Sequence, residues 1–165
     1  MHGGTEEDLQ SGAALERKSE TGIAAAFFGT MVSQIPASPT KVKANLQNML
    51  DKCVNGNTVV ANIRGMRDGI PTRRTDKYSH TGSFTNEDGI ERMVIVSNYS
   101  SSGSWATYNP TASLSARIEP SATGTVLTIR HLTVDKALPP ATLSWASGSA
   151  SGCPDLTKAH ALGAT

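Results

Sequence analysis

Apolar residues in the first third of the chain recur with a helical period. They follow an i, i+1, i+4, i+5 pattern from Ile23 to Ile35, with small or polar residues between them. Pro36 ends this segment. A second helical stretch within residues 38–54 places five apolar residues on one face: Val42, Leu46, Met49, Leu50 and Cys53. Because the connector between the two stretches is short, we expect an αα-hairpin over about residues 22–54.

After Asn57 the apolar period changes from 3.6 to 2, which is typical of β-strands. Alternating or wholly apolar runs predict six strands, over residues 58–64, 92–98, 104–108, 113–119, 125–134 and 141–147. Turn residues separate several of these runs, at Asn109-Pro110, from Glu119 to Gly124, and at Pro139-Pro140. This spacing favours an antiparallel meander, a sandwich or a partly open barrel.

Together the patterns predict an α+β protein. Two to three N-terminal helices would pack on a five- to seven-stranded antiparallel β-sheet or sandwich spanning residues 58–146. The 165 residues suit a single domain, 1–165, with a core of its own. We expect its parts to be an acidic N-terminal arm (1–20), the helical hairpin (21–54), the β region (58–147) and a Ser/Gly linker and tail (148–165). No apolar stretch has the length of a membrane span.

The composition changes this picture only slightly. Aromatic residues make up 5% of the chain and hydrophobic residues 38%, and Ser, Thr, Ala and Gly fill the difference. Balanced charge and several strong apolar runs argue against disorder. A β-rich chain of small residues is common among extracellular and particle-forming subunits, so we expect a virion or extracellular location rather than the cytoplasm.

Cys53 and Cys153 are the only cysteines. They could form one bridge that closes a long loop, or remain two buried thiols, and the sequence leaves both alternatives open. The chain contains no CxxC motif and no Cys/His spacing suited to zinc, so we expect no metal site and no cofactor.

Histidines offer the main candidates for catalysis. His80 has serine and threonine neighbours, and His131 lies on the apolar face of the strand expected over 125–134. No nucleophile elbow, phosphate loop or local cysteine signature accompanies either histidine. The pair Glu87-Asp88 is explained by a turn between Asn86 and Gly89. An unrecognised enzyme with a site near His80 or His131 therefore stays a minor alternative.

Charge is unevenly distributed along the chain. Residues 5–20 carry a net charge of −3, from five acids and two bases. Residues 41–80 carry +5, from eight bases and three acids. Arginine and lysine could neutralise nucleic-acid phosphates, or the acidic arm of one subunit could lie on the basic segment of the same or a neighbouring subunit. An ordinary solvated loop is the third interpretation.

These observations favour a non-enzymatic assembly subunit of a multimeric particle, virion coat-like or part of a surface assembly. We expect a homo-oligomer whose basic segment makes non-specific phosphate contacts with nucleic acid or meets a neighbouring subunit. The residues expected to make these contacts are Arg64, Arg67, Arg73, Arg74 and Lys77. A secreted β-sandwich module that binds glycans or a cell-surface partner is the main alternative. Its exposed platforms would be Trp105, Tyr108 and Trp145.

Overall fold

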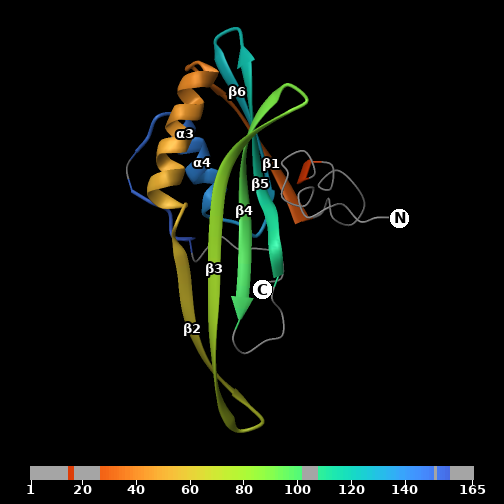
Figure 1. The fold of residues 1–165 in the computed structure, drawn as a ribbon, viewed down its shortest axis with the longest axis vertical. Coiled ribbons are helices and arrows are strands. Elements are labelled where there is room, and N and C mark those ends of the chain that lie inside the picture. The colour runs from red at the N-terminus through yellow and green to blue at the C-terminus, as the bar shows by residue number, and fades with distance from the viewer. Residues whose placement is uncertain (1–14, 17–26, 102–107, 151, 157–165) are drawn as a thin grey trace, which may run out of the picture.

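The computed structural model describes residues 15–16, 27–101, 108–150 and 152–156. Within them, six antiparallel strands form one sheet in the order β1-β6-β5-β4-β3-β2 (Figure 1). The strands are β1 (Phe28–Ile35), β2 (Thr58–Arg67), β3 (Ile70–Glu87), β4 (Ile90–Ser101), β5 (Tyr108–Ser121) and β6 (Gly124–Leu132). The helices are α3 (Pro39–Cys53), which follows β1, and α4 (Leu138–Ala146), which follows β6. The α+β class and the five- to seven-stranded antiparallel sheet are confirmed. The alternative of a sandwich and the N-terminal placement of all helices are wrong.

The sheet is an open meander to which the first strand, β1, adds one edge. Strands β2 to β6 pair in chain order, and β1 returns to pair with β6. Tight turns join β2 to β3 and β3 to β4. In each turn an Asp-Gly pair has positive φ at both residues, Asp68-Gly69 and Asp88-Gly89. Such turns match the twist of the flanking strands, and glycine adopts positive φ without steric cost.

Both helices cover the same face of the sheet and form the main core with it. Ser38 caps α3 by accepting a hydrogen bond from Lys41 N, and the predicted apolar face of this helix is buried. A side chain at Gly82 would bring Cβ within 2.4 Å of Leu50, so glycine at this point of β3 lets α3 approach the sheet. No helix in the described ranges is long and apolar enough to cross a membrane.

The opposite face of the sheet carries a second, smaller apolar cluster and a partly buried ion pair. Leu15 is buried with Val94 of β4 and Ala112 of β5. Beside it, Arg92 Nε and Nη2 donate to the two carboxylate oxygens of Glu16 at 3.1 and 3.0 Å. The hydrogen bonds to Glu16 raise the pKa of Arg92 above its usual value. Residues 15 and 16 are therefore docked on the sheet.

The first predicted helix is wrong, because residues 28–35 form the strand β1. Eight residues of β1 pair with β6, from Phe28 opposite Leu132 to Ile35 opposite Thr125. The burial of β1 alternates along the strand, and this period of 2 competes with the helical pattern. Gly29 lies opposite His131, whose ring occupies the space that a Cβ at Gly29 would need. The αα-hairpin expected over residues 22–54 is therefore absent from the described part of that range.

The last predicted strand, over residues 141–147, is also wrong, because this segment belongs to the helix α4. Asp135 Oδ1 accepts hydrogen bonds from the backbone N–H groups of Ala137 and Leu138, both at 3.0 Å. Two prolines lie in the first turn of the helix. Backbone N–H groups of this turn have no acceptor within the helix, so the lack of an N–H in proline costs no hydrogen bond there. Leu138, Thr142 and Trp145 are buried at helical spacing.

Four predicted strands are confirmed in the described residues: β2, β4 and β5 are longer than predicted, and β6 ends at Leu132, two residues before the predicted end. The strand expected over residues 104–108 falls mostly outside the described residues, with β5 beginning at Tyr108. The structure adds β3, an 18-residue strand over most of the segment that the sequence left irregular. This strand carries the basic residues of greatest interest.

Candidate functional site

The basic segment forms a β-hairpin that projects beyond the rest of the sheet (Figure 1). Strand β4 pairs with β3 only from Asp76 onward, whereas β2 and β3 remain paired out to Arg67 and Ile70. Residues 62–75 therefore form a ribbon of two strands to which no other described residues pair; we call this hairpin the arm, as distinct from the acidic segment 1–20. Six residues per strand at about 3.4 Å each give the arm a length of about 20 Å.

Four arginines and one aspartate give the arm a net charge of +3. Arg64 of β2 lies directly opposite Arg73 of β3, and both residues are exposed. Like charges directly opposite each other destabilise a strand pair. Arg67 lies three residues beyond Arg64 and so projects from the other face of the ribbon. The arm therefore presents cations on both faces.

The arm also exposes apolar side chains close to its tip. Met66 and Ile70 are 70% and 65% exposed, and Pro71 lies opposite Met66. Asp68 occupies the apex, in the turn with Gly69. The charge pattern of the sequence does not indicate these apolar residues as part of a site. The dipeptide Asp-Gly between two β-compatible runs was the available signal, because it is a strong hairpin marker.

The predicted contact residues divide into two groups. Arg64, Arg67 and Arg73 lie on the arm, and Arg74 occupies its register position opposite Ile63. Lys77 lies at the base, where β3 already pairs with both neighbours, and it is exposed.

The acidic residue that the structure describes in the N-terminal segment does not contact the arm. Glu16 pairs with Arg92 of β4 and approaches Arg117 of β5 at 4.0 Å. The other acids of residues 5–20 lie outside the described residues. Among the described residues, no carboxylate forms a salt bridge with Arg64, Arg67 or Arg73. The three cations are therefore accessible to an anionic partner.

His80 takes part in a buried chain of hydrogen bonds rather than an open site. Its Nδ1 lies 2.7 Å from Ser97 Oγ, which in turn lies 2.7 Å from Ser113 Oγ. Ser113 donates to the carbonyl of Ile95, beside the point where the β4–β5 register shifts. His80 and Ser97 are 3% and 2% exposed. This burial favours a structural role in closing the irregular part of the sheet.

His131 shows no catalytic partner in the described part of the chain. Its Nδ1 donates to the carbonyl of Leu132 at 2.8 Å, and its ring lies against Gly29. Among the described residues, no group of three or more His, Cys, Asp and Glu side chains could hold a metal ion.

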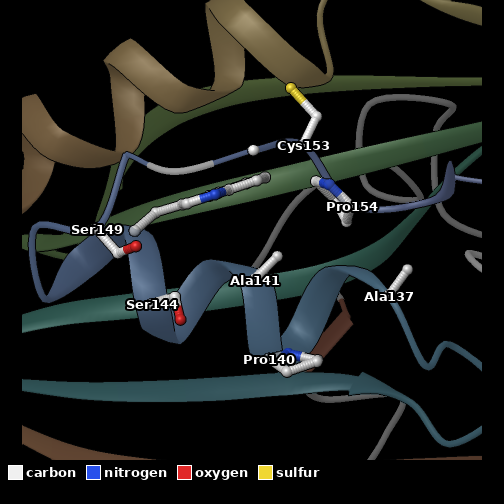
Figure 2. A pocket seen from close by; sticks show the side chains of 9 residues that line it. Ala137, Pro140, Ala141, Ser144, Ser149, Cys153 and Pro154 are labelled. Atoms are coloured by element: carbon white, nitrogen blue, oxygen red, sulfur yellow. The ribbon is translucent and has the colours of Figure 1, made fainter.

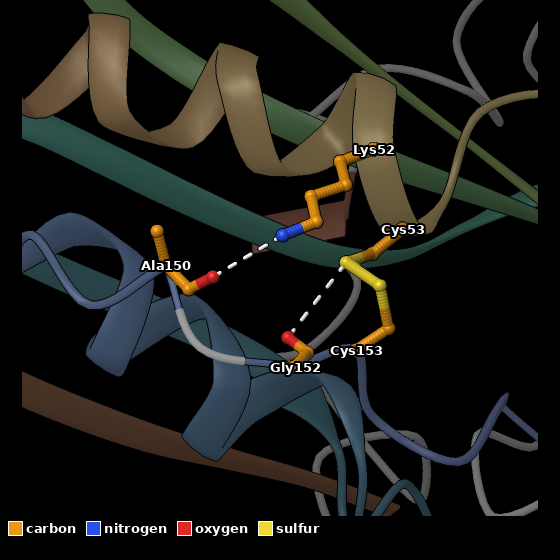
Figure 3. Close-up of a disulfide and its surroundings, with 5 residues drawn as sticks. All are labelled: Lys52, Cys53, Ala150, Gly152 and Cys153. Carbon is orange, nitrogen blue, oxygen red and sulfur yellow. Dashed lines mark hydrogen bonds between the residues drawn. A yellow bond between two sulfur atoms is a disulfide. The ribbon is translucent and has the colours of Figure 1, made fainter.

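Cys53 and Cys153 are joined by a disulfide, with their Cα atoms 5.3 Å apart (Figure 3). The bridge ties the end of α3 to the segment that follows α4, across 100 residues of sequence. Lys52 Nζ donates to the carbonyl of Ala150 at 3.3 Å and fastens the same segment a second time. The region expected to be a Ser/Gly linker is thus anchored to the body at these residues.

A shallow cleft of about 370 Å³ lies between α4 and this anchored segment (Figure 2). The described residues that line it include no ionisable side chain, since Cys153 is bonded: Ala137, Pro140, Ala141, Ser144, Trp145, Ser149, Gly152, Cys153 and Pro154. Trp145 is only 3% exposed, so it is not the exposed platform that a glycan-binding module needs. Trp105 lies outside the described residues, and only the backbone of Tyr108 is described.

Comparisons with known proteins do not assign the chain to a family. No protein-family model matches it, and no curated protein matches it. One solved structure, protein NE0264 from Nitrosomonas europaea, is similar at a TM-score of 0.34 and 16% sequence identity. The alignment covers 68% of this chain and 79% of that protein. A likeness this slight carries no argument about fold or function.

Proposed function

We propose that this protein is a non-enzymatic assembly subunit that reaches an anionic partner with its arm. The observation that carries the proposal is the exposed pair Arg64 and Arg73, held opposite each other on an unsupported ribbon. This arrangement costs free energy in the free protein. Phosphates or carboxylates bound at the two guanidinium groups remove the repulsion and add charge-assisted hydrogen bonds.

The rest of the arm supports a contacting role. A two-stranded hairpin without a third strand is marginally stable in water, so a ribbon of this length gains from a partner. Met66 and Ile70 expose most of their apolar surface beside the cations. Burial of both side chains against a partner would contribute about 1.5–3 kcal/mol each before the cost of association.

The disulfide supports a location outside reducing compartments. Disulfides persist in secreted, periplasmic and virion-surface proteins and are rare in the cytosol. We therefore propose a virion or extracellular setting, in which the subunit forms a homo-oligomer. The partner of the arm is then a nucleic acid or an acidic surface of a neighbouring subunit.

Light scattering tests this function directly. The mass of the wild-type chain is measured at about 50 and 200 mM salt, beside the variant Arg64→Gln/Arg73→Gln. We expect the wild type to exceed the monomer mass at low salt, alone or with added nucleic acid, and the variant to remain a monomer. The charge-matched control Lys41→Gln/Lys136→Gln removes two exposed cations outside the arm. A wild type that stays monomeric and binds no polyanion would refute the proposal.

A further inference from the structure

Three features of the arm together indicate what kind of anion it binds. We propose that the arm enters the major groove of double-stranded DNA and holds the phosphates of both groove walls. This inference rests on the proposed function, because it assumes that the arm is the contacting element, and it adds the partner.

The first feature is the shape of the arm. Residues 62–75 form a ribbon of two strands, and within the described ranges each pairs with no strand but the other over this length. The major groove of B-form DNA is about 12 Å wide and about 8.5 Å deep, and it admits a two-stranded β-ribbon. The projecting length of about 20 Å exceeds this depth, so the tip can reach the groove floor without a clash with the sheet.

The second feature is the distribution of charge around the ribbon. Arg64 and Arg73 project from one face, and Arg67 projects from the other. A flat anionic surface would contact one face of the ribbon and leave the opposite cations in water. The two walls of a duplex groove are both lined with phosphates, so they meet cations on both faces at once.

The third feature is the tip. Met66, Ile70 and Pro71 supply apolar contacts at the depth where base edges and thymine methyl groups lie. Asp68 at the apex can accept a hydrogen bond from an exocyclic amino group on the groove floor. The same carboxylate argues against insertion into a lipid surface, because Asp68 at the apex would enter the acyl region first and a charged group is costly there.

The described carboxylates argue against a second copy of this chain as the partner. Two acids near the β3–β4 turn are paired, Glu91 with Lys43 at 2.6 Å and Glu87 with Arg92 at 3.9 Å, which leaves the exposed Asp88 as a single carboxylate at this turn. Asp51 accepts hydrogen bonds from Gln47 and Asn55. The described surface therefore offers no acidic patch that matches the +3 of the arm.

Fluorescence anisotropy with short labelled duplexes tests the inference on the full-length chain. We expect salt-dependent binding to B-form DNA that is tighter than binding to an RNA duplex of the same sequence, whose major groove is too narrow for side chains. In Arg64→Gln/Arg73→Gln, the slope of log affinity against log salt should fall by about 1.8, because two phosphate contacts are lost. At about 0.1 M salt this difference corresponds to about a 60-fold weaker affinity.

Two further variants sharpen the test. Lys41→Gln/Lys136→Gln makes the same charge change outside the arm and should leave the slope unchanged if only the arm meets phosphates. Met66→Ser/Ile70→Ser should weaken binding to DNA while keeping the salt slope, because it removes apolar contacts and no cation. Equal affinity for DNA duplex, RNA duplex and single strand would overturn groove entry. Tighter binding to vesicles of anionic phospholipid than to DNA would overturn the choice of partner.

The outcomes separate this inference from the function on which it rests. If the arginine variant changes the oligomer mass without affecting DNA binding, the arm contacts protein and the inference fails while the assembly function stands. If the variant changes neither the mass nor DNA binding, the arm is not the contacting element and both proposals fail. If it changes DNA binding in a chain that stays monomeric, groove entry stands and the assembly function fails.

Discussion

The disulfide is expected to contribute a large share of the stability of this fold. Cys53 and Cys153 are 100 residues apart in sequence, so the bridge closes most of the sheet into one loop. In the chain-entropy model, a loop of this length destabilises the unfolded state by about 4.7 kcal/mol. Replacing both cysteines by alanine should therefore lower the free energy of unfolding by about 4–5 kcal/mol. For a chain of this size the melting temperature should fall by about 10–20 °C.

Urea unfolding of the wild type and of Cys53→Ala/Cys153→Ala measures this loss. Wild-type protein unfolded in the presence of a reductant is the matched control, because it loses the bridge without a change of side chain. The two should agree to within about 1 kcal/mol, since Cys53 is buried and its replacement adds only a small cavity. A loss under about 1 kcal/mol in both samples would refute the reasoning and mean that the bridge does not restrict the unfolded chain.

Two further changes probe contacts that position the sheet. Gly82→Ala should destabilise the fold by about 1–3 kcal/mol, because the added Cβ would lie 2.4 Å from Leu50. Chemical denaturation measures this loss. An unchanged midpoint would contradict the close packing of α3 on β3. Glu16→Gln should cost about 3 kcal/mol, because the buried Arg92 guanidinium loses the carboxylate that accepts two of its hydrogen bonds and keeps the more distant Glu87 at 3.9 Å. Glu119→Gln, in an exposed ion pair, should cost less than about 1 kcal/mol. Equal losses in the two variants would show that the Glu16–Arg92 pair is no stronger than a surface pair.

Part of the fold could be predicted because local patterns and tertiary structure agree. The helix α3 has a cap, an apolar face and a glycine beyond its end, and all three signals point to the same segment. The central strand β4 is apolar over Met93, Val94 and Ile95, which matches its burial on both faces.

The two wrong assignments, a helix for residues 28–35 and a strand for residues 141–147, arise because short apolar segments fit both the helical period of 3.6 and the strand period of 2. Residues 28–35 satisfy a helical pattern, but pairing with β6 over eight residues decides for a strand. Residues 141–146 alternate like a strand, but the cap from Asp135 and the prolines of the first turn decide for a helix. Such choices depend on distant partners, which periodicity within one segment does not reveal.

The candidate site was predictable in its residues but not in its shape. Charge clustering indicated Arg64, Arg67 and Arg73 directly. That Arg64 lies opposite Arg73 depends on the register of β2 and β3, which the Asp68-Gly69 turn sets. The projection of the arm depends on where β4 stops pairing, and no residue within the arm encodes that point.

We assign the contact with the partner to the arm rather than to the body of the sheet. Replacing residues 63–74 with Asn-Gly tests this assignment. This change joins Asn62 to Thr75, which already lie opposite each other, through a two-residue turn. Light scattering at low salt, with and without duplex DNA, then compares this armless chain with the wild type. We expect the armless chain to keep its melting temperature to within a few degrees, to remain a monomer and to leave DNA unbound. An armless chain that still assembles or binds DNA as the wild type does would contradict the account.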